Sequence, residues 1–324
     1  MSMVSVVCLV LQAFDQPKRQ KGRHQKPPNP LHSKTQISKS PTPPHPHRHS
    51  NSMVLYVVGL GLGDEDDITV RGLKAVQRSE IVFLEAYTSV LGTPKERLEA
   101  AFGKSIIVAD RTMVESEAER IYLPAKETDV CFLVVGDPLC ATTHSDIILR
   151  AKEAGIPVEV VHNASVMGAV ASCGLQLYSF GYTVSIPLFE GEWRPDSFYP
   201  KIAYNRAGGM HTLCLLDIKM KEPDYEEMMR GRVRYLPPRF MTVNIAIEQL
   251  LAVEAVREEG VLSLETPAVG LARLGQPTQQ IVAGTLGELL EVDFEGPLHC
   301  LVICGEQHPC EVELLQFFHV SRGE

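Results

Sequence analysis

The feature that most constrains the fold is a continuous apolar run in residues 129–136, DVCFLVVG. Six apolar side chains follow one another there between Asp129 and Gly136. Such a run is typical of a strand that is buried on both faces of a parallel sheet, because no position in it is reserved for water. The run therefore predicts a parallel sheet with cover on both sides.

The segments around this run alternate between strand-like and helix-like patterns. A helix is expected at 68–79, and another at 144–155 with Gly155 as its C-cap. Further strands are expected at 53–61, 81–87, 105–110 and 156–162. Strands that alternate with helices indicate a doubly wound α/β domain.

The second half repeats the pattern with different content. Helices are expected at 197–209 and 243–260, the second with a clear apolar stripe. Strands are expected at 183–189, 211–218, 267–274, 280–286 and 298–305. Short, hairpin-like connections near the end predict mixed strand directions. We divide the chain into a basic N-terminal extension (1–52), an N-terminal α/β domain (53–165) and a C-terminal α/β domain (166–324).

The N-terminal extension differs in composition from the rest. It holds eight Lys or Arg and one acid, a charge of +7 that leaves −16 on the remainder of the −9 total. Residues 15–52 almost lack large apolar side chains, so we expect disorder there. An organelle transit segment stays open as a reading. An extension that contributes nothing to the fold is favoured, because Met53 stands directly before the first predicted strand.

Composition also excludes several classes of function. No apolar stretch approaches the 18 residues that a membrane span needs, so no membrane association is expected. A body as acidic as residues 53–324 is a poor binder of phosphate backbones, so no nucleic-acid partner is expected. The eight cysteines are scattered without a CxxC pair, which suggests reduced thiols in the cytoplasm.

Cysteines and histidines close together near the C-terminus raise the possibility of a metal site. Cys300, Cys304 and Cys310 lie near His299 and His308. Their spacing fits no common zinc pattern, so a strand followed by a turn is the favoured interpretation and no metal is expected.

Three loops follow predicted strands and carry the candidate ligand contacts. The first, GLGLGD at 59–64, fails the dinucleotide pattern G-x-G-x-x-G because Asp64 stands at its last glycine position. In the second, at 136–146, Asp137 could receive a ligand ammonium or hydroxyl, while Thr142, Thr143 or Ser145 could cap a helix.

The third loop, HNASVMGAV at 162–170, joins a strand to a helix, and its Ser165 could cap that helix or bind a ligand. Open α/β sheets bind ligands at the carboxyl ends of their strands. Three such loops at one sheet edge predict a ligand site there.

The order of these loops resembles the tetrapyrrole methylase superfamily, and further motifs resemble its diphthine methyl ester synthase (diphthine synthase) family. The resemblance covers 53–324. The motifs that carry it are LEAYTSVL (84–91), VVGDPLCATTHSD (134–146), HNASVMGAV (162–170), GLQLYSFG (174–181), WRPDSF (193–198), GMHTLCLLDIK (209–219) and YLPPRFMTVNIA (235–246).

The resemblance implies a two-domain tetrapyrrole-methylase-like fold with S-adenosyl-L-methionine in the cleft between domains. The cofactor contacts that it implies are Leu62, Asp137, Cys140, Ser165, Val166, Leu216, Leu274 and His299. One departure concerns Cys140, where the family usually has glycine. A backbone contact would survive that change, but the side chain could narrow the pocket.

The implied reaction is S-adenosylmethionine-dependent methylation of the 3-carboxy-3-aminopropyl histidine of translation elongation factor 2, in diphthamide biosynthesis. It comprises trimethylation of the amine and methylation of the carboxylate, and the family suggests a homodimer. No catalytic residue is assigned. His144, His162 and His211 lie near the motifs and could relay a proton, or serve only packing and hydrogen bonding.

A basic run at Arg230, Arg232, Arg234 and Arg239 interrupts the acidity of the body. It is either a solvated connection or a grip on an acidic face of the elongation factor or on the substrate carboxylate. The rival functions are a related methylase that acts on a tetrapyrrole or on ribosomal RNA ribose, an NAD-dependent oxidoreductase, and a binding protein without activity.

Overall fold

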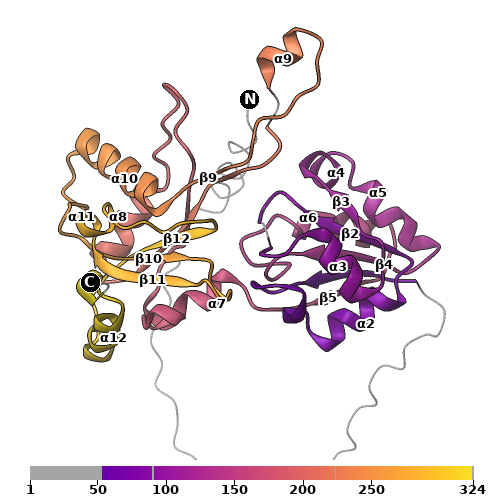
Figure 1. The fold of residues 1–324 in the computed structure, drawn as a ribbon, viewed down its shortest axis with the longest axis horizontal. Coiled ribbons are helices and arrows are strands. Elements are labelled where there is room, and N and C mark those ends of the chain that lie inside the picture. The colour runs from indigo at the N-terminus through magenta and orange to yellow at the C-terminus, as the bar shows by residue number, and fades with distance from the viewer. Residues whose placement is uncertain (1–52, 90, 223, 323–324) are drawn as a thin grey trace, which may run out of the picture. The chain divides into compact units, whose positions relative to one another are not determined.

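The computed structural model describes residues 53–89, 91–222 and 224–322. The predictions for residues 1–52 lie outside these ranges. Two five-stranded sheets organise the described chain, one built from residues 55–161 and the other from residues 184–303 (Figure 1). The split of 53–324 into domains at residue 165 stays a prediction.

The first sheet is parallel throughout and has the order β3-β2-β4-β1-β5. Its strands are β1 Leu55–Gly59, β2 Ile81–Glu85, β3 Ile107–Ala109, β4 Val130–Val134 and β5 Val158–Val161. The central strand β4 sends Cys131 and Leu133 into one apolar core, and Phe132 and Val134 into another. Burial of this strand on both faces, predicted from its sequence, is confirmed.

Helices cover both faces of the first sheet. On one side α2 (Val70–Arg78) and α3 (Lys95–Phe102) pack against the core that contains Leu133. On the other side lie α4 (Arg111–Glu115), α5 (Glu119–Tyr122) and α6 (Ser145–Glu153). The chain leaves α6 through Gly155, which has a left-handed φ of 75° that favours glycine. The doubly wound α/β arrangement is confirmed.

The second sheet has the order β11-β10-β12-β7-β6 and mixes strand directions, as predicted. Its strands are β6 Val184–Ile186, β7 Thr212–Leu216, β10 Pro267–Ala272, β11 Gln280–Thr285 and β12 His299–Ile303. Only β6 and β7 are parallel neighbours within this sheet; the other pairs are antiparallel.

Helices also cover both faces of the second sheet. One face packs against α8 (Tyr199–Ala207), α10 (Val243–Arg257) and α11 (Leu286–Leu289). On α10, Val243, Ala246, Ile247, Leu250 and Val253 form the predicted apolar stripe. The other face packs against α7 (Val166–Ala169), α12 (Pro309–Leu315) and the short 3-10 helices η3 (Val170–Cys173) and η5 (Gln316–Phe318).

Residues 218–222 and 224–240 form an arm that extends from the second sheet (Figure 1). Its two legs pair as the short antiparallel strands β8 (Ile218–Lys219) and β9 (Arg239–Phe240). A five-residue helix, α9 (Tyr225–Met229), lies at the far end. The remaining elements are the 3-10 turns η1 Glu65–Asp67, η2 Leu123–Lys126, η4 Leu177–Ser179 and η6 Val320–Arg322. Over the described ranges, no helix has the length and apolar character required to cross a bilayer.

Candidate functional site

The three predicted ligand loops are joined to one another by hydrogen bonds. Gly61 and Gly136 exchange backbone hydrogen bonds, with N···O distances of 3.2 and 2.7 Å. The side-chain amide of Asn163 donates to the carbonyls of Gly59 (2.9 Å) and Asp67 (3.0 Å). Because β4, β1 and β5 are adjacent parallel strands, their loops meet at one edge. The predicted meeting of the loops is confirmed.

Glycine is required in the first loop by close approach of the backbone. A Cβ on Gly59 would lie 2.5 Å from the carbonyl oxygen of Gly136. The loop turns around Asp67, whose carboxylate accepts hydrogen bonds from the backbone N–H groups of Leu62 (3.2 Å) and Gly63 (2.7 Å). Asp64, at the position where a dinucleotide loop has glycine, caps η1 through its side chain. The aspartate that breaks the dinucleotide pattern thus has a local structural role.

Asp137 is the buried acid at the centre of the three loops. One carboxylate oxygen accepts from Leu139 N (2.9 Å), and the other accepts from His162 Nδ1 (2.8 Å) and Asn163 N (3.1 Å). Burial raises the pKa of Asp137, but these hydrogen bonds outweigh burial and hold the pKa below its usual value. The side chain therefore keeps a negative charge and braces the second loop against the third.

The rest of the second loop differs from one prediction. The residue that precedes α6 is His144, with no side-chain hydrogen bond to the helix, and the Thr142 hydroxyl instead donates to the carbonyl of Pro138 (2.6 Å). The expected capping by Thr142, Thr143 or Ser145 is wrong. Cys140 is half-buried and its N–H donates to the carbonyl of Asp137 (3.3 Å). The left-handed residue is the next one, Ala141, so the backbone does not require glycine at 140.

Ser165 and Val166 begin α7 beside the second loop. Ser165 occupies the N-cap position and is buried, but its hydroxyl makes no hydrogen bond to the helix backbone. A Cβ on Gly136 would lie 3.9 Å from the side chain of Ser165, which places this serine against the glycine. Val166 packs on the core beneath the second sheet. Leu62, Asp137, Cys140, Ser165 and Val166 thus all lie on the three joined loops.

The three predicted contacts from the second half lie at one end of the second sheet. Leu216 ends β7 and His299 begins β12, which is the neighbouring antiparallel strand. His299 is also paired with Ala272 on β10, two residues before Leu274. Strand register therefore brings Leu216, Leu274 and His299 together.

The loop after β10 also reaches the first glycine loop. A Cβ on Gly275 would lie 2.8 Å from the Cβ of Leu62, and a Cβ on Gly63 would lie 2.9 Å from the Gly275 carbonyl oxygen. Glycine at both positions lets the two backbones approach. Leu62 and Leu274 belong to loops in direct contact.

His299 lines a cavity of about 190 Å³. Its Nδ1 accepts from Val243 N (3.4 Å), which leaves Nε2 as the donor to the carbonyl of Gly296 (3.0 Å). Burial lowers the pKa of His299, so the ring is neutral at pH 7. The other lining residues are Phe240, Met241, Thr242, Glu295 and Pro297.

The three candidate histidines have different surroundings. His144 is buried edge-on against Phe132, and burial lowers its pKa to about 4. His211 is buried with its Nδ1 accepting from Gly305 N (2.9 Å) and its Nε2 3.4 Å from the Glu311 carboxylate. His162 is the exposed one and holds Asp137. The geometry favours packing and hydrogen bonding for all three, and a proton relay stays a prediction.

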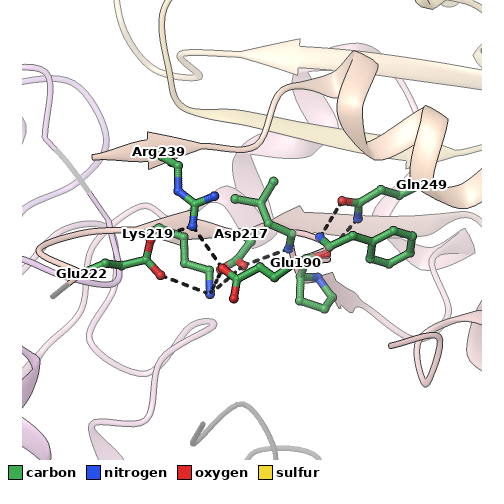
Figure 2. A network of polar contacts seen from close by, with 9 residues as sticks. Glu190, Asp217, Lys219, Glu222, Arg239 and Gln249 are labelled. Atoms are coloured by element: carbon green, nitrogen blue, oxygen red, sulfur yellow. Dashed lines mark hydrogen bonds and ion pairs between the residues drawn. The ribbon is translucent and has the colours of Figure 1, made fainter. Parts of the chain in front are cut away.

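In the described part of the chain there is no candidate metal site, and the four arginines of the basic run do not act as one basic surface. No three or more His, Cys, Asp or Glu residues in these ranges are arranged to hold a metal ion. Within the basic run, Arg230 and Arg232 both pair with Glu227, at 2.6 and 3.4 Å. Arg239 pairs with Glu190 and Glu222 at the base of the arm (Figure 2). Arg239 is thus a structural residue.

Comparison with known proteins places these observations in a family. The family model described as Tetrapyrrole (Corrin/Porphyrin) Methylases matches residues 54–290. The diphthine methyl ester synthase of Dictyostelium discoideum is 55% identical over 262 residues, 80% of this chain and 96% of that protein. The human diphthine methyl ester synthase is 54% identical over 265 residues, 80% and 93% of the two chains.

Solved structures agree. A putative diphthine synthase from Entamoeba histolytica matches with a TM-score of 0.74 and 47% identity, over 82% of this chain and 98% of its own. A second diphthine synthase structure matches with a TM-score of 0.71 and 34% identity, over 83% and 98%.

Replacing Asp137 by Asn should destabilise the fold. The side-chain NH2 of Asn is a donor, and it would face N–H groups that now donate to the carboxylate. We therefore expect a loss of about 1–3 kcal/mol in the free energy of unfolding. Urea denaturation at pH 7 measures this loss. Asp146→Asn is the matched control: Asp146 forms an exposed pair with Arg150, and its loss should cost about 0.5 kcal/mol or less. Equal stability of the two variants would contradict the bracing role of Asp137.

His144 should make stability depend on pH in a defined window. Its folded pKa of about 4 lies below the usual 6.5, so the unfolded chain binds a proton that the folded chain excludes. Stability should therefore fall as the pH drops from 6.5 to 4, by about 3 kcal/mol in total. The free-energy difference between the parent protein and His144→Asn, measured by denaturation across this window, should shift by that amount. A constant difference would show that His144 does not titrate as described.

Proposed function

The chain belongs to the tetrapyrrole methylases and, within them, to the diphthine methyl ester synthase family, and from this we propose its substrate and site. It is a methyltransferase that uses S-adenosyl-L-methionine. The proposed acceptor is the 3-carboxy-3-aminopropyl histidine of translation elongation factor 2, in diphthamide biosynthesis. The proposed reaction is trimethylation of the amine and methylation of the carboxylate.

The observation that carries this proposal is the joining of the three loops at the edge of the first sheet. Gly59, Gly61 and Gly136 form a cradle of close backbone there, and Asp137 keeps a negative charge beside it. A charged sulfonium or ammonium is attracted by such a carboxylate. Oδ2 of Asp137 already accepts two hydrogen bonds and Oδ1 accepts one, so a ligand donor would use the remaining lone pair of Oδ1.

The proposed cofactor contacts form two groups. Leu62, Asp137, Cys140, Ser165 and Val166 come from the joined loops, and Leu216, Leu274 and His299 come from one end of the second sheet. The Ser165 hydroxyl, which is not used by α7, can hydrogen-bond a ligand. Neutral His299 adds no positive charge that would repel a sulfonium. The residues present fit a cationic cofactor.

The chemistry asks for orientation more than for a dedicated catalytic group. The cofactor, when bound, supplies an electrophilic methyl group on sulfur. The protein has to hold the acceptor nitrogen or oxygen in line with that methyl group and exclude water, which can contribute several kcal/mol, on the order of 7 or more in well-oriented systems. Removal of an ammonium group from water lowers its pKa and favours the free amine that attacks.

The rival functions have weaker support. An NAD-dependent oxidoreductase would use the first loop for pyrophosphate, but Asp64 and Asp67 place two carboxylates there, and both fold the loop itself. A methylase for a tetrapyrrole or for ribose would share the fold. Identities of 54–57% with diphthine methyl ester synthases favour the modified histidine.

We also propose that the enzyme works in the cytoplasm. All seven cysteines of the described ranges are unpaired, which suits a reducing compartment.

Mass spectrometry of the acceptor tests the proposed function. The enzyme is incubated with elongation factor 2 that carries the 3-carboxy-3-aminopropyl histidine and with isotope-labelled S-adenosylmethionine. We expect labelled methyl groups on that histidine, on both its amine and its carboxylate. Calorimetry should show binding of S-adenosylmethionine and none of NAD. Cofactor binding without methyl transfer to the factor would refute the proposed substrate, while transfer to the amine alone would refute the ester step.

The enzyme is further proposed to be a homodimer, as the family suggests. An exposed aromatic pair supports this: the rings of Tyr182 and Tyr204 lie 5.6 Å apart and both are exposed, and Tyr178, four residues before Tyr182, is 97% exposed. Exposed aromatic side chains of this kind are enriched at interfaces between proteins. Light scattering should give twice the chain mass of 35.8 kDa. Tyr182→Ser with Tyr204→Ser should shift the mass toward the monomer. A parent protein that is monomeric at every concentration would exclude the dimer.

A further inference from the structure

We propose that the arm is the docking surface for the protein substrate. The surface, called the arm face below, consists of Met229, Val233, Arg234, Tyr235 and Leu236. The partner surface that fits it presents apolar side chains next to a carboxylate. This inference rests on the proposed function, since it assumes that the acceptor is carried by a protein.

Both legs of the arm grow out of the proposed cofactor site. The first leg begins at Ile218, two residues after Leu216. The second leg ends at Phe240, which lines the cavity beside His299. A partner held on the arm is therefore connected through a few residues of chain to groups proposed to contact the cofactor.

The arm also reaches the edge of the first sheet. Lys221 forms an ion pair with Asp110, the residue that caps α4 immediately after β3. The carboxyl end of β3 lies at the same edge as the three joined loops, because the sheet is parallel. The first leg of the arm thus touches the edge where the acceptor must arrive.

An ionic network fixes the base of the arm (Figure 2). The Lys219 ammonium lies 3.6–3.7 Å from carboxylates of Glu190, Asp217 and Glu222. Arg239 binds Glu190 at 3.0 Å and Glu222 at 2.7 Å, which ties the two legs together. Five charged groups held in this way order the base of the arm against the second sheet.

The order extends outward along the legs. Leu236 N donates to the Glu222 carbonyl (2.8 Å), and Asp224 N donates to the Arg234 carbonyl (2.9 Å). The Lys221 ammonium lies 5.1 Å from the ring centre of Tyr235. The backbone that carries the arm face is therefore held in place before any partner binds, which lowers the ordering cost of association.

The arm face is apolar and open to solvent. Met229 is 84% exposed and Val233 is 80% exposed, and Tyr235 and Leu236 are exposed as well. Arg234 has no carboxylate partner among the described residues, whereas Arg230 and Arg232 share Glu227. Exposed apolar side chains next to an exposed arginine without a carboxylate partner are typical of interaction surfaces, where Arg and aromatic residues are enriched.

The protein substrate fits the arm face better than a second copy of the chain does. The acceptor is one side chain on a protein, so the enzyme needs a surface near its site for the protein around that side chain. The arm is rooted at the site, whereas the exposed tyrosines proposed for the dimer come from other elements, η4 and α8. The unpaired Arg234 selects a partner with a carboxylate.

The test compares a double serine variant of the arm face with a single serine variant elsewhere, both in the full chain. Met229→Ser with Val233→Ser removes the most exposed apolar side chains of the arm face without touching the proposed cofactor contacts. We expect the KM for the modified elongation factor to rise about tenfold, with kcat and the Kd for S-adenosylmethionine unchanged, because interface energy is concentrated in a few side chains. The matched control is Val256→Ser. Val256 is 85% exposed near the far end of α10, about 20 Å along that helix from Val243, and its change should leave KM within about twofold.

A short peptide that contains the modified histidine provides the second readout. It lacks the surface that would bind the arm face, so both variants should methylate it like the parent protein. An unchanged KM for the whole factor, while the parent methylates it, would overturn the docking inference alone. Equal losses on peptide and factor, or conversion of a dimer to a monomer, would also overturn it. A parent protein that leaves the factor unmethylated would remove the proposed function and this inference together.

Discussion

The site depends on one buried carboxylate that is charged because its neighbours donate to it. Asp137 lies in the loop after the central strand β4 and receives hydrogen bonds from its own loop and from the loop after β5. Between these strands lies β1, whose glycine loop exchanges two backbone hydrogen bonds with Gly136. Removal of that charge would leave three donors, on Leu139, His162 and Asn163, without their charged acceptor. Because each of the three loops is positioned through the others, all of them would be affected.

The parallel sheet explains why this carboxylate sits where it does. β4 is buried on both faces, so its only access to solvent and ligand is at its ends. Gly136, with a φ of 77°, turns the chain there and lets the first loop approach. The same apolar residues that force the strand into the centre of the sheet thus place the next two residues, Gly136 and Asp137, at the ligand edge.

Elements that depend on local periodicity were predictable from the sequence, and those that depend on distant charges were not. The run at 129–136 and the stripe of α10 carry their burial pattern within a few residues. The arm carries no such pattern. Its order comes from Glu190, which lies 29 and 49 residues before its partners Lys219 and Arg239 in the sequence, and from Asp110, which follows β3 of the first sheet. From the sequence alone, the segment is therefore only a polar connection with four arginines. Capping by Thr142 was not predictable for a local reason: α6 begins only after His144, and the Thr142 hydroxyl donates to the carbonyl of Pro138.

The arginines of the arm show how identical residues acquire separate roles. Arg239 is held between two carboxylates at the base, and Arg230 and Arg232 share Glu227 near the tip. These three positive charges are therefore paired with carboxylates of the protein itself. Arg234 alone among them has its backbone carbonyl tied to Asp224 and its guanidinium without a carboxylate in the described structure. Exposed ion pairs contribute little to stability, about 0–1 kcal/mol each. The ion pairs of the arm therefore do more to fix the shape of this short segment than to stabilise the fold. A segment whose shape is fixed while its apolar side chains stay in water is organised for contact with another molecule.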